Sequence, residues 1–423
     1  MAKWFYCLLR GMGEKPSPIR RRLFFMAKRY TNIFAVVALV FIIASCYPIT
    51  VRESKSPLKK VRYLWPEFQD DLDKDSLVLA AERSMTYFDR LGDKNVFYFG
   101  PDTFSIEHIR ESHKTFLRII QQNPNNDFLN KELRKKFLLY KATGINSDSK
   151  ILFTGYYEPV FDGSTECDSV YKYPIYGRPD DLLSIELGLF RSKWAGQRIM
   201  GRIKDKKVVP YYERKDIAEG DAFKDKNLEI AWLKDPFDIA ILQTQGSGII
   251  KITNGEWLHV GYSASNGHAY KSIGKYMIER GYIKREDLTL QAISSFLTDH
   301  PDMKRDILNH NPSYVFFEIN DGGPIGSINV PLTAGRSLAV DSKLFPKGAL
   351  VYIKCQRPVI GNDGHIKDWV QFSRFLFNQD TGGAIKGPGR ADIFWGNGLD
   401  AEIIAGHLKH FGEMYFLVMK PNF

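Results

Sequence analysis

The feature that most constrains the fold of this chain is a glycine-rich run bracketed by two aspartates, Asp380 and Asp392. The run from residue 380 to residue 396 reads DTGGAIKGPGRADIFWG. Glycine adopts the positive φ angles that a tight loop needs, and it lets a ligand approach the backbone closely. The apolar residues 375–377 before the loop and the segment 392–395 after it predict two short strands. Both carboxylates would then lie at strand ends that can aim them into a groove, although a loop with two solvated aspartates has the same pattern.

The positive charge of the chain is concentrated near its N-terminus. The formal net charge is +10, but residues 1–45 contain eight Lys or Arg and one Glu, a net of +7, which leaves +3 for the remainder. A nucleic-acid-binding function therefore lacks the basic surface that it needs. With 423 residues, of which 44% are hydrophobic, the chain is long enough for two globular domains with buried cores.

Residues 1–45 have the parts of a secretory signal peptide: a basic stretch, an apolar run over residues 33–44, and small residues before Cys46. The apolar run is shorter than the about 20 residues of a comfortable bilayer span. Its end, IASC, resembles the lipobox of bacterial lipoproteins, which predicts a lipid on Cys46 and a tether over residues 46–65. Met26 is an alternative start, and an uncleaved anchor helix is the alternative to cleavage.

Cysteine usage favours no metal site. Only Cys167 and Cys355 follow Cys46, and they show neither a CxxC pair nor zinc-type spacing. In an exported protein they could form one disulfide, and two ordinary buried thiols fit the sequence equally well.

The strand expected at residues 151–159 offers aromatic groups for sugar binding. The run contains Thr154, Gly155, Tyr156 and Tyr157 before a proline ends it. Adjacent tyrosines on a strand point to opposite faces, so one can pack inward while the other lines a groove. The apolar face of a pyranose commonly lies on such a ring while its hydroxyls find polar partners. Ordinary cross-strand packing is the alternative explanation.

A second polar site is expected near residue 245. Residues 238–252 are interpreted as a strand, a polar glycine kink and another strand, with Gln245, Gly246 and Ser247 at the kink. These neutral hydrogen-bonding groups suit uncharged hydroxyl or amide ligands. The GxG here lacks the third glycine and the following helix of a dinucleotide fingerprint, so no nucleotide cofactor is expected.

The remaining pattern predicts helices followed by short strands. Apolar stripes predict helices near residues 75–91, 105–121, 127–141, 271–279, 285–298 and 301–309. His108 and His113 on the second helix are interpreted as surface residues rather than ligands. His268, at a helix start, is interpreted as structural, with a catalytic base as the alternative. From residue 314 onward, short strands with glycine turns and one late helix at 400–410 indicate a small closed barrel.

Six ordered motifs indicate the family that this chain resembles. The runs TGYYEP, QGSG, NGHAY, NPSYVFF, VPLT and DxGGAIKG…DxFxG occur between residues 154 and 396 in the order found in the membrane-bound lytic murein transglycosylase A family. The resemblance covers roughly residues 60–420. Six motifs in one order are far more specific than a single glycine-rich loop.

The resemblance implies a mainly β fold with helices, built on a double-psi β-barrel from residues 60–157 and 324–423. A second β-rich domain, residues 158–323, would be inserted into it, with the substrate groove between the two. Family members cleave the β-1,4 bond between N-acetylmuramic acid and N-acetylglucosamine in peptidoglycan without adding water. This leaves 1,6-anhydromuramic ends and serves murein turnover and remodelling. No cofactor or metal is expected.

The resemblance also implies the surroundings of the protein. Peptidoglycan glycan strands are the expected partner, and the chain would be held to a membrane through the lipid on Cys46. Other cell-wall synthesis or hydrolysis proteins are further expected partners, whereas nucleic acid is not. Tyr47 stands where lipoproteins retained in the inner membrane have an aspartate, which favours an outer-membrane lipoprotein facing the periplasm.

The family's catalytic aspartate corresponds to Asp392. It would donate a proton to the glycosidic oxygen and then accept the proton of the muramic 6-hydroxyl as that oxygen attacks C1. A protonated aspartate near neutral pH needs a raised pKa, which burial or the charge of Asp380 can supply. The positive charge of Arg390 would lower that pKa if its side chain pointed inward, so the side chain is expected to point outward. Asp380 is the expected electrostatic partner. The expected substrate-binding residues are Thr154, Gly155, Tyr156, Tyr157, Gln245, Gly246, Ser247 and Lys386.

Two other functions fit the same residues. An inverting or retaining glycosidase would use Asp380 as its second carboxylate and would add a water to the product. A non-catalytic peptidoglycan-binding lipoprotein would keep the tyrosines and Gln245 and would tolerate the loss of Asp392.

Overall fold

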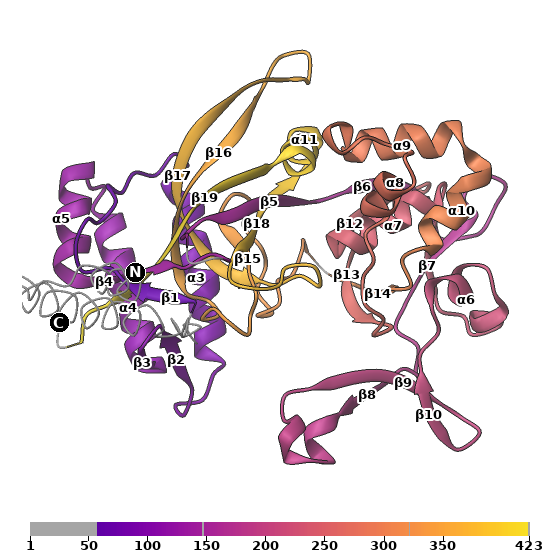
Figure 1. Cartoon of the computed structure of the whole chain (residues 1–423), viewed down its shortest axis with the longest axis horizontal. Coiled ribbons are helices and arrows are strands. Elements are labelled where there is room, and N and C mark those ends of the chain that lie inside the picture. Colours follow the sequence, from indigo (N-terminus) through magenta and orange to yellow (C-terminus); the bar gives the residue numbers. More distant parts are fainter. Residues whose placement is uncertain (1–56, 146–147, 321, 422–423) are drawn as a thin grey trace, which may run out of the picture. The chain divides into compact units, whose positions relative to one another are not determined.

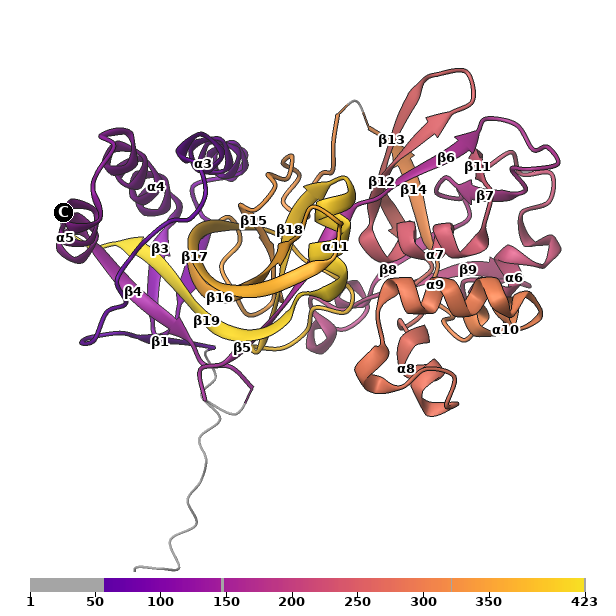
Figure 2. The same ribbon diagram turned by 90° about the horizontal axis from the view of Figure 1, so that it is seen from above.

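A closed barrel of six strands carries both aspartates (Figures 1 and 2). In the order of their pairing, the strands are β19 (Lys409–Met419), β16 (Leu350–Ile360), β17 (Ile366–Asp380), β15 (Ser337–Ala339), β18 (Arg390–Asn397) and β5 (Ile151–Glu158). The barrel closes because β19 pairs with β16 on one side and with β5 on the other. Two pairs, β15 with β17 and β5 with β18, run parallel. The barrel predicted from the sequence is confirmed.

This computed structural model describes residues 57–145, 148–320 and 322–421. The expected signal peptide, the alternative start at Met26, the lipid site at Cys46 and the first part of the tether lie outside the described residues. Within the described ranges, no helix has the length and apolar character needed to cross a membrane.

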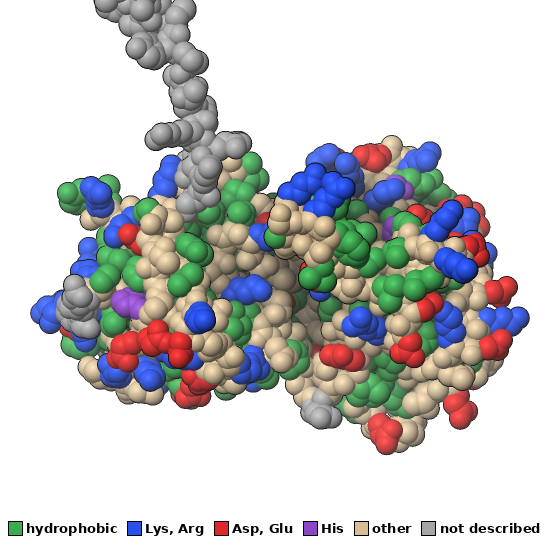
Figure 3. Space-filling model, turned by 90° about the horizontal axis from the view of Figure 1, so that it is seen from below, with side chains coloured by type: hydrophobic (Ala, Val, Ile, Leu, Met, Phe, Trp, Pro, Cys, Tyr) green, Lys and Arg blue, Asp and Glu red, His purple; other side chains and the backbone are tan. Residues whose placement is uncertain are grey.

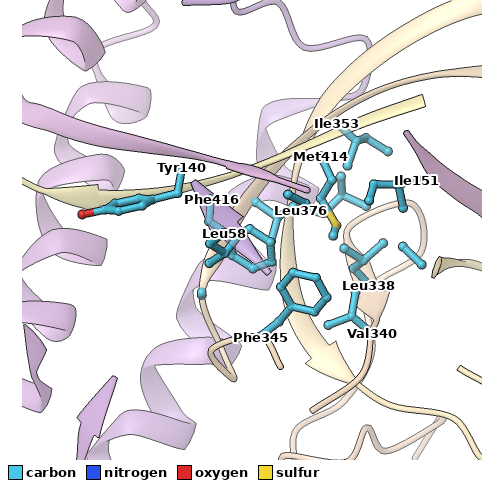
Figure 4. Packing of buried hydrophobic residues seen from close by; sticks show 14 of the residues in the cluster. Leu58, Tyr140, Ile151, Leu338, Val340, Phe345, Ile353, Leu376, Met414 and Phe416 are labelled. Atoms are coloured by element: carbon cyan, nitrogen blue, oxygen red, sulfur yellow. The ribbon is translucent and has the colours of Figure 1, made fainter. Parts of the chain in front are cut away.

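Apolar side chains fill the inside of the barrel. Strands alternate the direction of their side chains, and the alternate residues Ile151 and Phe153 on β5 and Ala391 and Ile393 on β18 are buried. They belong to one buried cluster with side chains of the other barrel strands. Figure 4 shows part of this cluster, including Ile151, Leu338, Ile353, Met414 and Phe416. The residues between them on β5 and β18 point to the outside of the barrel, where the candidate site lies.

Helices α3 (Lys74–Asp89) and α4 (Ile106–Gln121) pack on the barrel strands, and α5 (Asn126–Lys136) packs against α4. Each begins after a residue whose side chain accepts a hydrogen bond from the first turn. The predicted helices at 75–91 and 105–121 are confirmed. The predicted third helix, 127–141, is too long, because residues 137–142 leave it to form β4 (Phe137–Ala142), which pairs with β19.

His113 on α4 corrects another expectation, since it is buried rather than at the surface. Its two ring nitrogens each lie 3.0 Å from a backbone oxygen, one of Ile109 and one of Gly348. Burial lowers the pKa of His113 to about 4, so the ring is neutral. His113 therefore joins α4 to the turn that precedes β16.

A second β-rich unit is inserted in the chain between β5 and β15. Its sheet has the order β14 (Val315–Ile319), β13 (Trp257–Ser265), β12 (Ser247–Ile252), β6 (Val160–Ser164), β11 (Glu229–Leu233) and β7 (Tyr173–Tyr176). The helices of this unit are α6 (Arg214–Ala218), α7 (Pro236–Gln245), α8 (Ile273–Glu279), α9 (Leu290–Asp299) and α10 (Pro301–Asn309). A separate sheet contains β8 (Leu183–Glu186), β9 (Arg198–Lys204) and β10 (Lys207–Pro210). In the described ranges the remaining strands are β1 (Leu58–Lys60), β2 (Val96–Phe99) and β3 (Asp102–Ser105), and the remaining α-helix is α11 (Leu399–His407).

The interpretation of residues 238–252 as two strands is wrong for the first of them. Residues 236–245 form helix α7, and only β12 is a strand. The Asp235 side chain caps the helix, Pro236 occupies its first turn, and Gly246 ends it with a φ of 86°. These end signals outweigh the apolar run between them.

Candidate active site

The sheet register brings Asp380 and Asp392 to either side of one residue. Ala339 of β15 pairs with Asp380 of β17 and with Asp392 of β18. Neighbouring strands lie about 4.8 Å apart, so the backbones of the two aspartates are separated by about 10 Å. Two residues on one face of β5 contact the two carboxylates: the Thr154 hydroxyl donates a hydrogen bond to Asp392, and the Tyr156 hydroxyl donates one to Asp380. The two carboxylates therefore lie on the same outer face of the barrel.

Asp392 is held by a hydroxyl and a guanidinium. The Thr154 hydroxyl donates a hydrogen bond to Asp392 Oδ1, and Arg390 Nε lies 3.6 Å from the same oxygen. Arg390 Nη2 also donates to Thr154 Oγ1 at 3.3 Å. Burial raises the pKa of Asp392, while the Arg390 charge and the Thr154 hydrogen bond oppose the rise.

The expectation that Arg390 points outward is therefore wrong. Residues two apart on a strand point to the same face, so Arg390 lies beside Asp392 as a direct result of their spacing on β18. About a third of the Arg390 side chain, 36%, is exposed, against 14% for Asp392. Water therefore weakens their attraction.

Asp380 accepts two hydrogen bonds, one at each oxygen. The Tyr156 hydroxyl donates to Oδ2 at 2.8 Å, and the Ser327 backbone N–H donates to Oδ1 at 3.0 Å. Burial raises the pKa of Asp380 to about 6, and the charge of Asp392 adds to the rise. Burial and the two carboxylates raise the pKa of Tyr156 far above its usual value, so its hydroxyl is a neutral donor.

Gly155 and Tyr157 lie on the opposite face of β5 from the aspartates. A Cβ at Gly155 would come within 2.8 Å of the Trp395 ring and 2.9 Å of the Ala405 backbone in α11. The Tyr157 side chain is buried, with 4% exposed. Of the two adjacent tyrosines, Tyr157 packs inward and Tyr156 faces the acids.

The polar residues expected near position 245 lie at the junction of α7 and β12. Gln245 Oε1 accepts a hydrogen bond from the Tyr157 backbone N–H at 3.1 Å, which ties the insert to the end of β5. Gly246 forms the turn, and Ser247 is half-buried at the start of β12. Lys386 is exposed in the loop that follows Asp380.

Glu158 is a third carboxylate near this face, and no sequence pattern assigns it a role. Glu158 lies two residues beyond Tyr156 on β5, and only 3% of it is exposed. Its Oε1 lies 4.0 Å from His259 Nδ1 on β13, and Asn397 donates to Oε2 at 3.4 Å. Burial raises the pKa of Glu158. Glu158 follows Tyr156 in the TGYYEP run by two residues, as Tyr156 follows Thr154, and this spacing is the sequence signal that places all three on one face of the strand.

The insert also supplies Tyr270, from the NGHAY run, which lies close enough to Arg390 of β18 to feel its charge. Burial raises the pKa of Tyr270, and the charges of Arg214 and Arg390 oppose that rise. In the neighbouring residue His268, Nε2 lies 2.8 Å from the Tyr211 carbonyl oxygen, which agrees with a structural role. The surface is hollowed between the half with the barrel and the half with the insert (Figure 3).

No metal centre is formed in the described ranges, where no three His, Cys, Asp or Glu side chains are grouped to hold an ion. Cys167 is exposed and Cys355 is buried, and both are free thiols. The disulfide alternative is therefore wrong, and so is burial of both thiols.

Comparisons with known proteins agree with the motifs. A family model described as the MltA specific insert domain matches residues 152–318, and a 3D domain model matches residues 336–418. Membrane-bound lytic murein transglycosylase A of Vibrio cholerae is 33% identical over 282 residues, which span 66% of this chain and 68% of the relative. The chain belongs to the membrane-bound lytic murein transglycosylase A family.

Solved structures of this family share the fold. A membrane-bound lytic murein transglycosylase from Agrobacterium tumefaciens matches with a TM-score of 0.70 and 27% identity, covering 86% of this chain and 97% of that one. The structure of Escherichia coli MltA with bound chitohexaose matches with a TM-score of 0.67 and 24% identity, covering 88% and 97%.

Proposed function

We propose that Asp392 is the single acid and base of a lytic transglycosylase that cleaves the β-1,4 bond between N-acetylmuramic acid and N-acetylglucosamine. The reaction class follows from membership of the family, whose members are peptidoglycan-cleaving enzymes of the lyase type. The observation that carries the choice of acid is the position of Asp392 on the outer barrel face, sparsely exposed and bonded by Thr154.

One carboxyl group can serve both steps of this reaction. Protonated Asp392 gives its proton to the glycosidic oxygen as the C1–O bond breaks and positive charge develops on the sugar ring. The resulting carboxylate takes the proton of the muramic 6-hydroxyl as that oxygen bonds to C1. The proton is returned to Asp392 and no water is added, so the product ends in a 1,6-anhydro ring.

Asp380 is proposed to act through its charge. When ionised, it favours the positive charge that develops on the sugar ring and raises the pKa of Asp392. Tyr156 and Ser327 each donate to one of its oxygens. This arrangement fixes the carboxylate in place and leaves it less suited to activate a water, as the base of an inverting glycosidase must.

The proposed sugar contacts are divided between barrel and insert. Thr154 and Tyr156 offer a hydroxyl and a ring beside the acids, and Gln245 and Ser247 offer neutral polar groups from the insert. Gln245 Oε1 is engaged by the backbone, which leaves its amide N–H groups as donors. The proposed roles of Gly155, Tyr157 and Gly246 are to shape the backbone around these contacts, and that of Lys386 is to contact substrate from its exposed loop.

We also propose where the protein lies in the cell and where its domains begin and end. The leader sequence supports acylation of Cys46 and an outer-membrane position facing the periplasm. We propose a catalytic domain from residues 60–157 and 324–423 and an insert from residues 158–323.

Digestion of purified peptidoglycan in water enriched in ¹⁸O tests the reaction. The proposed chemistry yields anhydro ends without the isotope, and it continues in EDTA. One ¹⁸O atom in each new reducing end would mean hydrolysis and would make Asp380 a catalytic partner.

A further inference from the structure

The sheet of β8, β9 and β10 forms an arm, residues 183–210, that projects from the insert (Figure 1). We propose that this arm binds the surface of an anionic phospholipid bilayer. The proposal is independent of the reaction at Asp392, because it rests on the exposed apolar and basic side chains of the arm alone.

One face of the arm is apolar and exposed. The register pairs Ile185 with Ile199 and Val208 with Ile203, so these four side chains share a face. Ile203 is 66% exposed, Val208 58% and Ile199 48%. A monomeric protein rarely leaves several large aliphatic side chains together on one surface unless the surface binds something.

The turn between β8 and β9 adds two more exposed apolar side chains to the arm. Its two short helices are η1 (Leu187–Leu189) and η2 (Ser192–Trp194). Leu189 is 86% exposed and Phe190 is 70% exposed. The guanidinium of Arg191 lies 5.3 Å from the centre of the Trp194 ring, and the ammonium of Lys193 lies 5.2 Å from it.

Cations lie at both ends of the apolar face. Lys204, Lys206 and Lys207 surround the hairpin turn, while Arg191 and Lys193 lie in the turn at the other end. Seven cationic side chains minus two carboxylates give residues 183–210 a net charge of +5. Because the chain from Cys46 onward carries +3, the part outside the arm carries 3 − 5 = −2. The arm is therefore positive, whereas the rest of the chain from Cys46 onward is, taken together, slightly negative.

The other face of the arm attaches it to the insert. The Arg202 guanidinium lies 4.0 Å from the centre of the Tyr212 ring. Met200 packs so closely against Gly267 that a Cβ on Gly267 would lie 2.6 Å from the Met200 Cβ. The apolar face points away from these contacts, because residues 200 and 202 alternate with 199 and 203 on β9. Figure 3 views the side from which the arm projects and shows hydrophobic side chains close to Lys and Arg side chains.

An anionic bilayer fits this surface better than the alternatives. Aliphatic side chains enter the headgroup region while flanking Lys and Arg reach the lipid phosphates. A second copy of the chain would bring two surfaces of +5 together, which charge repulsion disfavours. Glycan strands call for polar groups and flat aromatic rings rather than isoleucine and valine.

Sedimentation with lipid vesicles tests the arm. The protein used is residues Ser56–Phe423, a compact unit with its own cores that lacks the apolar leader. We expect it to sediment with vesicles of phosphatidylglycerol and phosphatidylcholine, but not with phosphatidylcholine alone, and to show a blue shift of tryptophan fluorescence. Each cation near the surface changes the partition coefficient by about five-fold, so Lys206→Glu with Lys207→Glu should lower it by at least about 25-fold.

The matched controls separate the arm from total charge and from misfolding. Lys114→Glu with Lys131→Glu changes the charge equally at exposed positions on α4 and α5, and it should leave vesicle binding nearly unchanged. Ile203→Ser with Val208→Ser should lower binding by at least about ten-fold while peptidoglycan cleavage continues. The proposal would be overturned if both lysine double variants lost vesicle binding equally, if the protein bound vesicles of pure phosphatidylcholine, or if it bound no vesicles. It would also be overturned if the arm substitutions abolished self-association or peptidoglycan binding and left vesicle binding intact.

Discussion

Replacing Arg390 with Gln tests whether the Asp392 carboxyl must be protonated for activity. Arg390 Nε lies 3.6 Å from Asp392 Oδ1. At that distance Coulomb's law gives about 5 kcal/mol for an effective dielectric constant of 20 and about 1 kcal/mol in water. Because 36% of the Arg390 side chain is exposed, solvent screens the pair, and the attraction is taken as about 1 to 2 kcal/mol.

Loss of the cation shifts Asp392 toward its protonated form. Arg390 favours the carboxylate and so lowers the pKa of Asp392; removing it raises that pKa. An attraction of about 1 to 2 kcal/mol corresponds to roughly 5- to 30-fold more protonated Asp392 at a pH above the pKa. A general acid acts only while it holds its proton, so the alkaline limb of kcat/KM should move to higher pH.

The assay is the rate of anhydro-muropeptide release from soluble glycan strands across a range of pH. The position of the limb is the readout, because a weaker acid also donates less readily and lowers the plateau. Arg390→Lys is the matched control, since it keeps a cation but loses the guanidinium hydrogen bond to Thr154. A limb that stays in place or moves to lower pH in Arg390→Gln would refute the reasoning, as would an equal displacement in Arg390→Lys.

Three further predictions concern stability. Arg336 is fully buried and makes a bidentate pair with Asp70, with both contacts at 2.8 Å. Arg336→Met should lower the free energy of unfolding, measured by denaturant titration, by about 3–5 kcal/mol, and a loss below about 1 kcal/mol would argue against the pair. Gly155→Ala should cost about 1–3 kcal/mol and lower the melting temperature, because its Cβ would come within 2.8 Å of the Trp395 ring. An unchanged melting temperature would show that the ring has room to move. Burial raises the pKa of Asp380 to about 6, so stability from this group is present at low pH and is lost as pH rises through about 6. Asp380→Asn should therefore melt higher than the wild type near pH 8 and no higher near pH 4, and the opposite order would contradict the assigned burial.

The sequence predicted the local parts of the site better than their partners. The strand at 151–158, the two aspartates and the helices 301–309 and 105–121 follow from short-range patterns and capping. The pairing of Ala339 with both aspartates depends on β-sheet register between distant segments, which no local pattern contains. The hydrogen bond from the Ser327 backbone to Asp380 likewise joins segments that are distant in the sequence, so no local pattern predicts it.

Some errors came from signals that were present in the sequence. The apolar run that begins at residue 238 favours a strand, yet Asp235, Pro236 and Gly246 are the end signals of helix α7. Strand alternation already placed Arg390 on the face of Asp392. The burial of His113 was harder to foresee, because its partner Gly348 is 235 residues away.

The measurement that tests the central claim most directly is mass spectrometry of muropeptides released from purified peptidoglycan by Ser56–Phe423 and by its Asp392→Asn variant. General acid–base catalysis contributes about 10²- to 10⁴-fold, so anhydro-ended products should fall by at least about 100-fold in the variant. Circular dichroism and sedimentation with the wall would confirm that the variant still folds and binds. Anhydro products at the wild-type rate from Asp392→Asn would contradict the assignment of Asp392 as the acid and base.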